Sequence, residues 1–199
     1  MIKAGLTPDK KTLNQYYHPL PDGILRDSGL SHYHLSATFT EEGWTSLSMK
    51  IGEKPRILVS YVRNIDVTNI IPKDFANSME VTKKITMGEI PSEIRARINM
   101  EPFPLLESEI GLAKQALDVQ PHVNIVSLYK SKNERITVEW RVSLYGPERV
   151  RRFTERIGFL PGSEAERKFE KTWETYEENK DKKLSRKDIK NIRKKLKEI

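Results

Sequence analysis

The sequence predicts an α+β domain in which helices pack on one face of an antiparallel sheet of four strands. Two patterns carry this prediction. Apolar and polar residues alternate over 44–51 and again over 135–145, which is typical of strands with one exposed face. Between these strands, apolar residues of 104–117 recur every three or four positions, as they do along one side of a helix. The resulting order is helix, hairpin, helix, hairpin, helix, helix.

Composition restricts the class of protein before any motif is considered. The 199 residues are 37% hydrophobic, which is enough for an ordinary core. No apolar run approaches the ~20 residues of a membrane span, and the N-terminus lacks a signal-peptide pattern, so we expect a cytoplasmic protein away from membranes. The absence of cysteine excludes disulfides, thiolate zinc sites and a cysteine nucleophile. The high content of charged residues favours a thermophilic source, prokaryotic or archaeal.

The first helix follows an arm rich in proline and glycine. Residues 1–29 show little periodicity, and we expect them to be irregular apart from one turn over 12–17. Ser31 is a suitable N-cap for a helix that runs to Glu42. Gly43 comes next, where we expect the helix to end in a left-handed turn.

The two sides of this helix differ in character. Leu35 and Phe39 lie one turn apart, and we expect them to face the core. Small side chains on another side would let a second helix approach closely; these are Ser36, Ala37 and Thr40.

The first hairpin is predicted directly after this helix. In its first strand one face is apolar and the other is polar, the polar residues being Ser46, Ser48 and Lys50. A turn over 52–55 leads to a second strand over 56–63.

The middle of the chain is read as an insertion followed by a helix and a second hairpin. Residues 65–102 contain short apolar pieces interrupted by Pro72, Pro91 and Pro102. The amphipathic helix over 104–117 should cover the sheet. Strands over 123–129 and 135–145 then flank a turn at 131–134.

Two helices close the body of the domain. Gly146 and Pro147 open the first, which ends at Gly158. Ser163 and Glu166 form a capping box for the second, which presents a face of Phe169, Trp173 and Tyr176.

The positive charge is concentrated in the tail. Residues 180–199 hold ten Lys or Arg and three Asp or Glu, which accounts for the whole net charge of +7. Ser185 and Asp188 form a capping box, so we expect a helix over 186–199. This helix is too short to be stable alone, and its apolar seam should dock on the body or on a second subunit. The seam consists of Ile189, Ile192, Leu196 and Ile199.

The segment 35–43, LSATFTEEG, resembles the signature of the LAGLIDADG family of homing endonucleases. Leu35 stands at the first position of that signature, Glu42 at its acidic eighth and Gly43 at its closing ninth. Four letters depart from the consensus, at Ser36, Thr38, Thr40 and Glu41. The segment 149–173 is similar to the family's closing helix pair around an Ile-Gly-Phe.

The resemblance covers 30–176 and implies the family's fold, a saddle-shaped four-stranded sheet in the order α-β-β-α-β-β-α-α. It divides the chain into an irregular arm (1–29), a LAGLIDADG-like domain (30–178) with an insertion over 65–102, and a basic tail (179–199).

The family uses the open face of its sheet to read double-stranded DNA in the major groove, which implies a DNA-binding role for the outward-facing strand residues. By alternation these are Ser46, Ser48, Lys50, Arg56, Ser60, Arg63, Thr137, Glu139, Arg141 and Ser143. The tail helix is expected to add phosphate contacts through Lys187, Lys190, Arg193, Lys194 and Lys197.

The resemblance also implies a metal-dependent reaction. The family carries one metal-binding acid at the end of each motif helix, and Glu42 matches it as a ligand of Mg²⁺ or another divalent cation. Glu41 takes this role if the register is shifted by one residue. The family's basic residue near the start of the penultimate helix is missing, because Tyr145 and Gly146 stand there. Its substitute would be Arg141, Lys50 or Arg63.

The function implied is a site-specific, divalent-metal-dependent double-strand DNA endonuclease. A double-strand cut needs two active sites, so we expect a homodimer packed through Ser36, Ala37 and Thr40. Two other readings are open: a non-cleaving DNA-binding regulator of the same type, and a protein-interaction module whose basic tail binds an acidic partner.

Overall fold

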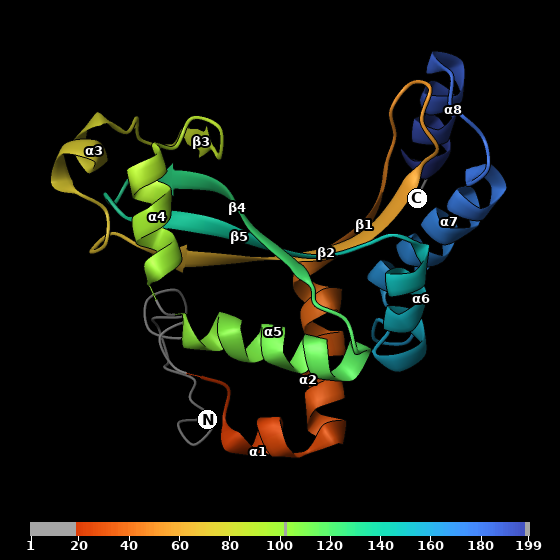
Figure 1. The fold of residues 1–199 in the computed structure, drawn as a ribbon, viewed down its shortest axis with the longest axis horizontal. Helices are drawn as coiled ribbons and strands as arrows, with labels where there is room; N and C mark the ends of the chain where they lie inside the picture. Colours follow the sequence, from red (N-terminus) through yellow and green to blue (C-terminus); the bar gives the residue numbers. More distant parts are fainter. Residues whose placement is uncertain (1–18, 102, 198–199) are drawn as a thin grey trace. The chain divides into compact units, whose positions relative to one another are not determined.

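The computed structural model describes residues 19–101 and 103–197. It is an α+β structure, as predicted, with a five-stranded antiparallel sheet in the order β1-β2-β5-β4-β3 (Figure 1). The chain forms two compact units. The first unit comprises Met1–Leu30, Val62–Leu112 and Val123–Val142, and the second comprises Ser31–Tyr61, Ala113–His122 and Ser143–Ile199. None of the described helices has the length and apolar composition needed to cross a membrane.

Helix α2 (Ser28–Glu42) ends where the sequence predicts but begins four residues earlier than a helix capped by Ser31 would. Asp27 provides the cap in place of Ser31, since its side chain accepts a hydrogen bond from the Leu30 N–H at 3.0 Å. Ser31 therefore lies inside the helix and is buried. The described part of the arm is also less irregular than expected, because Asp22–Arg26 forms a short helix, α1.

The apolar side of α2 builds the core of the second unit. Leu35 and Phe39 are fully buried, as predicted. The Phe39 ring packs against Tyr61 of β2 (Arg56–Asp66) at a centroid distance of 4.9 Å and against Phe153 of α6 (Pro147–Arg156) at 4.6 Å. From Phe153 a row of contacting rings continues through Phe159, Phe169, Trp173 and Tyr176.

Gly43 has a role other than the predicted left-handed turn. It is the first residue of β1 (Gly43–Ser48) and pairs with Tyr61. A Cβ atom at this position would lie 2.3 Å from the Phe39 carbonyl oxygen and 2.9 Å from that of Ser60. Glycine is needed here because the end of α2 and strand β2 approach the backbone too closely for any side chain.

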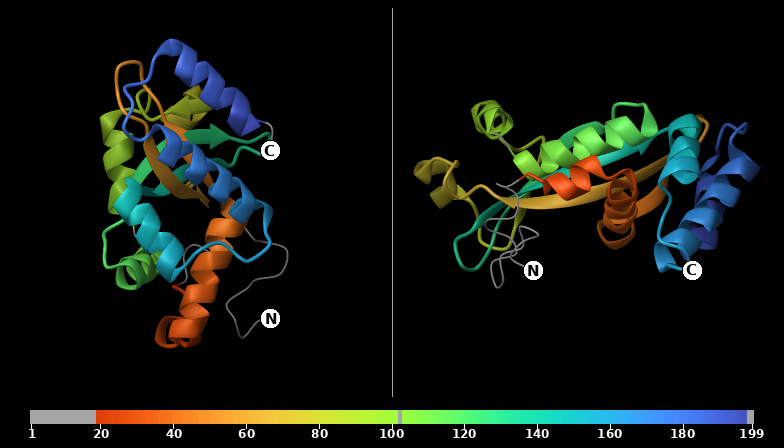
Figure 2. Two further views of the ribbon diagram at one scale, coloured as in Figure 1. Left: turned by 90° about the vertical axis from the view of Figure 1, so that its right-hand side faces the viewer. Right: turned by 90° about the horizontal axis from the view of Figure 1, so that it is seen from below.

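The first hairpin is confirmed, with β1 paired antiparallel to β2 from Gly43 and Tyr61 to Ser48 and Arg56. Helix α7 (Glu164–Asn179) contacts β1 and lies beside α8 (Arg186–Lys197) (Figure 2). Its predicted cap is present, since the Glu166 N–H donates to the Ser163 hydroxyl at 3.1 Å.

The first unit contains the strand that the sequence reading missed. The predicted insertion forms α3 (Lys73–Ser78), β3 (Lys84–Thr86) and α4 (Ser92–Met100). Strand β3 pairs antiparallel with β4 (His122–Lys130), from Lys84 and Tyr129 to Thr86 and Ser127. The sheet thus has five strands and not the predicted four. The sequence pattern did not reveal β3 because a three-residue strand is too short to show alternation.

The remaining elements agree with the sequence. Helix α5 (Pro104–Leu117) has the predicted bounds. Strand β4 and strand β5 (Ile136–Tyr145) flank the predicted turn, in which the Ser131 N–H donates to the Arg135 carbonyl at 2.8 Å. The even-numbered residues of β5, from Ile136 to Leu144, are buried.

We predict that Gly43→Ala lowers the free energy of unfolding by about 3 kcal/mol, the upper end of typical overpacking, because the added methyl group meets two backbone oxygens that cannot rotate away. Urea denaturation followed by circular dichroism measures this. Gly111→Ala in α5 is the control: apart from the adjoining backbone of its own helix, no atom lies within 4 Å of its Cβ position, so it should be neutral or stabilise by up to about 1 kcal/mol. Equal stability of the two variants would contradict the close approach at Gly43.

Candidate nucleic-acid interface

The carboxylate that the family resemblance singles out stands at a helix end. Glu42 is the last residue of α2 and is exposed, as is Glu41 beside it. The next residue already belongs to β1, so no loop separates this carboxylate from the sheet. The backbone at Glu42 is therefore fixed by the two regular elements that meet there, while its side chain is open to solvent.

Three basic residues were considered as substitutes for the basic residue that the family carries and this chain lacks, namely Arg141, Lys50 and Arg63. Two of them, Lys50 and Arg63, are not available at Glu42. Lys50 lies beyond the far end of β1, about 20 Å from Glu42 at the ~3.3 Å rise of a six-residue strand. It is exposed and its Nζ is 3.7 Å from the Glu53 carboxylate. Lys50 therefore cannot assist at Glu42 of the same chain.

Arg63 is not an outward-facing residue, and this expectation is wrong. Its guanidinium makes two hydrogen bonds to the Glu109 carboxylate of α5, at 3.0 and 2.7 Å. The side chains of Arg63 and Glu109 are 11% and 1% exposed. Alternation alone could not reveal this pairing, because the partner lies 46 residues away in the sequence.

In the second unit the open face of the first hairpin carries three of the expected residues. Ser46 pairs with Leu58 and Ser48 with Arg56, so their side chains share one face of the two strands. Ser48 and Arg56 are exposed, and Ser46 is partly exposed.

Ser143, expected on the same face, is fully buried. Its hydroxyl is 2.9 Å from the hydroxyl of Ser60, which is buried as well. These two serines join β5 to β2 inside the sheet, and so they cannot contact DNA in this conformation.

In the first unit the open face of β5 carries Thr137, Glu139 and Arg141, all partly exposed. The Glu139 carboxylate accepts a hydrogen bond from Lys84 of β3 at 2.8 Å. Lys84 is thus a basic residue of this face that sequence reasoning missed, because its strand was not recognised.

Two of the three small residues of α2 that were expected at a dimer contact make contacts within the same chain. Ser36 is buried. The Thr40 hydroxyl donates to the Ser36 carbonyl at 2.8 Å and accepts from the Leu160 N–H at 2.9 Å, which attaches the α6–α7 connection to α2. Ala37 remains partly accessible, and Tyr33, one turn before it, is 64% exposed.

The tail helix α8 is formed and docked, as predicted for its described part; Ile199 lies outside the described residues. The Asp188 side chain accepts from the Ser185 N–H at 2.8 Å, and the Asp188 N–H donates to the Ser185 hydroxyl at 3.2 Å. The hydrogen bond from the Ser185 hydroxyl, followed by that from its N–H, lowers the pKa of the Asp188 carboxyl below its ordinary value. The cap therefore stabilises the folded protein fully at pH values above the ordinary pKa of an aspartate. This stabilisation is lost as the pH falls through the lowered pKa of Asp188.

Docking of the tail uses backbone bonds and charge pairs. Leu184 is buried; its N–H donates to the Glu53 carbonyl at 3.0 Å and its carbonyl accepts from the Gly52 N–H at 2.8 Å. Lys54 pairs with Asp181 at 3.2 Å, and Lys195 pairs with Glu178 at 2.7 Å. The tail is thereby tied both to the hairpin turn and to α7.

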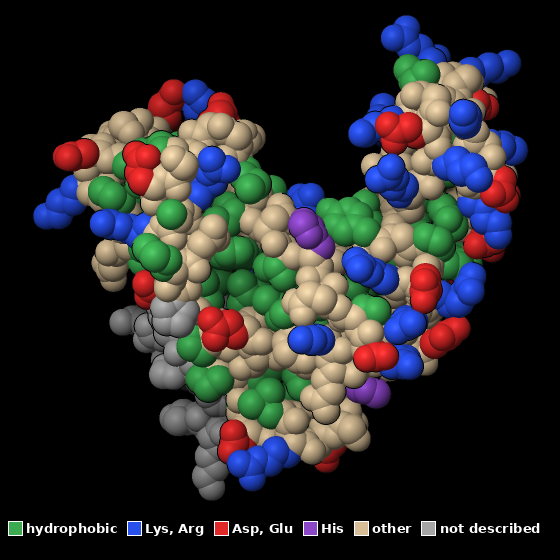
Figure 3. Space-filling model, in the orientation of Figure 1, with side chains coloured by type: hydrophobic (Ala, Val, Ile, Leu, Met, Phe, Trp, Pro, Cys, Tyr) green, Lys and Arg blue, Asp and Glu red, His purple; other side chains and the backbone are tan. Residues whose placement is uncertain are grey.

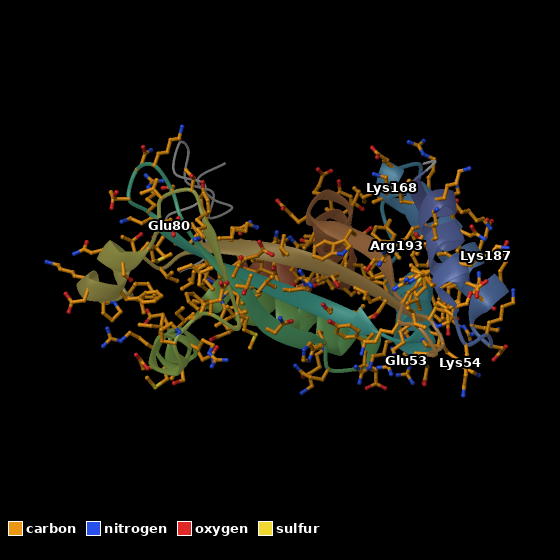
Figure 4. The ribbon with its side chains drawn as sticks, turned by 90° about the horizontal axis from the view of Figure 1, so that it is seen from above. Glu53, Lys54, Glu80, Lys168, Lys187 and Arg193 are labelled. Carbon is orange, nitrogen blue, oxygen red and sulfur yellow. The ribbon has the colours of Figure 1, made fainter. Side chains whose placement is uncertain are left out.

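Most basic side chains of α8 remain exposed, including Lys187, Lys190, Arg193 and Lys194. Figure 4 shows Lys187 and Arg193 on different sides of the helix. Over α7 and α8 the surface carries many Lys and Arg side chains (Figure 3).

Two grooves adjoin this helix, one beside the connection between β1 and β2 and the other beside β1 and α7. The larger, of about 700 Å³, has an apolar floor that includes Met49 and Ile51; its other lining residues are Arg186, Ile189, Lys190, Asn191, Arg193, Lys194 and Lys197. A second groove of about 520 Å³ also contains Arg193, together with Lys168 of α7. The tail therefore presents a basic groove rather than an isolated basic helix.

In comparisons with family models, curated proteins and solved structures, no significant match to this chain is found. Within residues 19–101 and 103–197, no group of three or more His, Asp or Glu side chains is arranged to hold a metal ion.

Proposed function

We propose that this protein is a DNA-binding protein of LAGLIDADG type that cleaves double-stranded DNA at a specific site with the help of Mg²⁺ or another divalent cation. The observation that carries the proposal is the junction at Glu42. There an exposed carboxylate ends a helix that has one buried face, and the chain continues directly into a strand whose outward side chains include Ser46 and Ser48.

The element order supports the family assignment. Helix α2 leads into the hairpin β1–β2, and α5 leads into β4–β5, which α6 and α7 follow. The two hairpins join through β2 and β5 at the centre of the sheet. This is the arrangement that the family resemblance implies, with α3, β3 and α4 added between the halves.

Recognition and affinity would come from different surfaces. Side chains on the strands can form hydrogen bonds with base edges in the major groove, which distinguish sequences. Lys and Arg of α8 can neutralise phosphates, which adds affinity for any sequence. The exposed residues of α8 fit this second task because they carry positive charge on several sides of the helix.

For the reaction, Glu42 would hold the cation together with the same residue of a second chain. When bound, such a cation lowers the pKa of the attacking water and stabilises negative charge on the phosphate. The exposure of Glu42 fits a shared site, because its carboxylate is open to a partner.

We predict that Glu42→Gln reduces metal-dependent nicking of a target plasmid more than about a hundredfold, since even loss of a group behind a metal ligand costs 10–100-fold. DNA affinity should stay within about twofold because no phosphate contact is lost. Supercoiled-plasmid nicking with and without Mg²⁺ and gel-shift titration measure the two effects. Glu41→Gln is the matched control. Loss of cleavage in that variant alone would assign the ligand to Glu41.

We further propose a homodimer across α2, with Ala37 and the neighbouring Tyr33 at the contact. Ala37→Leu should then shift sedimentation velocity toward monomer, because the larger side chain separates the two helices. His32→Leu, on another side of α2, adds the same side chain away from the contact and should leave the dimer intact. If the wild-type protein is monomeric, the model of a symmetric homodimer with one active site from each chain is wrong.

We predict that Lys190→Gln with Lys194→Gln weakens binding to all DNA sequences alike and flattens the slope of log affinity against log salt by up to about 1.8, since each phosphate contact contributes about 0.9. Substitution is preferable to deletion, because Leu184 anchors the tail to the hairpin. The control is Lys73→Gln with Lys132→Gln, two exposed lysines of the first unit. An unchanged slope would make α8 a packing element only.

A non-cleaving DNA-binding regulator is the second candidate, and specific observations favour it. Of the three basic residues considered as catalytic substitutes, Lys50 is distant from Glu42 and Arg63 is paired with Glu109. The position before α6 holds Tyr145 and Gly146. A wild-type protein that binds a genuine target tightly but does not cut it in any divalent metal would establish this function instead.

A further inference from the structure

A pocket of about 350 Å³ lies in the first unit, between α4 and β4, and none of its lining residues is assigned to DNA. Its volume falls at the lower end of the roughly 300–1,000 Å³ typical of small-molecule sites. It is lined by Met87, Ser92, Arg95, Ala96, Asn99, Val123, Asn124, Ile125 and Trp140.

Two lining residues have buried donor atoms with no hydrogen-bond partner among the described residues. These atoms are the indole Nε1 of Trp140 and the guanidinium Nε of Arg95. Trp140 is only 9% exposed, and its ring is held by Phe103 at a centroid distance of 6.0 Å. Buried donors are normally satisfied, so two in one pocket indicate a place for an acceptor.

The charge of the pocket specifies the kind of acceptor. No Asp or Glu lines it, and Arg95 makes no ion pair within the described residues. Ser92 is the first residue of α4, so the positive end of the helix dipole adds to the charge of Arg95. An anionic oxygen acceptor is favoured over a neutral one.

The rest of the lining specifies the body of the ligand. Met87, Ala96, Val123 and Ile125 contribute apolar surface, which a bare phosphate or a sugar-phosphate backbone would not use. A carboxylate attached to a short hydrocarbon chain satisfies both parts of the pocket, because Arg pairs well with carboxylates.

We propose that this pocket binds a small aliphatic carboxylate, with its oxygens toward Arg95 and the Trp140 indole and its hydrocarbon part against Met87 and Ile125. This binding does not depend on the proposed DNA function, since none of these residues is assigned to DNA.

The test uses sodium hexanoate as the probe and the indole N–H signals of the folded, full-length protein. The chain has three tryptophans, so three indole signals are expected in a ¹⁵N–¹H spectrum, and Trp140→Phe identifies one of them. Hexanoate should shift the Trp140 signal saturably and leave the other two unchanged. Hexanamide, which has the same shape without charge, should bind about tenfold more weakly or not at all.

Matched variants separate the site from general charge effects. Arg95→Gln should weaken hexanoate binding about tenfold, whereas Arg97→Gln, an exposed arginine of the same helix, should not. Asn99→Asp keeps the size of an exposed side chain and adds a negative charge to the lining, so it should also abolish binding while the protein stays folded.

Three results would overturn the proposal. They are the absence of a saturable shift with hexanoate, equal binding of hexanoate and hexanamide, and inorganic phosphate binding as tightly as hexanoate. If duplex DNA shifts the Trp140 signal and Arg95→Gln weakens DNA binding alone, the pocket belongs to the nucleic-acid interface instead.

Discussion

The second unit depends on the close contact between the end of α2 and strand β2. Phe39 meets Tyr61 and Phe153 in this contact, and Gly43 lets the two backbones approach to a distance that excludes any side chain. The direction of β1 and the position of Glu42 both follow from it, since β1 begins where the helix ends. The backbone that carries this carboxylate is thus fixed by the core of the second unit.

Polar residues on the strands serve two purposes, and alternation cannot separate them. Arg63 and Ser143 have the spacing of outward-facing residues, yet one pairs with Glu109 and the other with Ser60. Removing one partner of a buried ion pair typically costs 3–5 kcal/mol, because the other charge is left uncompensated. Arg63 is therefore a structural residue, and the proposed recognition surface is smaller than the sequence pattern indicates.

The tail shows how a short charged helix becomes ordered. Twelve residues rich in Lys and Arg would not remain helical alone, but the Ser185–Asp188 cap, the backbone bonds of Leu184 and the contact with α7 hold them in place. Ile192 of α8 is buried, and Lys187, Lys190, Arg193 and Lys194 are exposed. The groove beside Met49 and Ile51 results from this docking.

The sequence by itself determined the features that depend on neighbouring residues. Alternation and helical period located α5, both hairpins and α7, and local hydrogen bonding specified the caps at Ser163 and Ser185. Strand β3, the burial of Arg63 and Ser143, the role of Gly43 and the pocket at Trp140 were decided only by the tertiary structure. Their partners are distant in the chain, and a one-dimensional pattern carries no information about which distant residues meet.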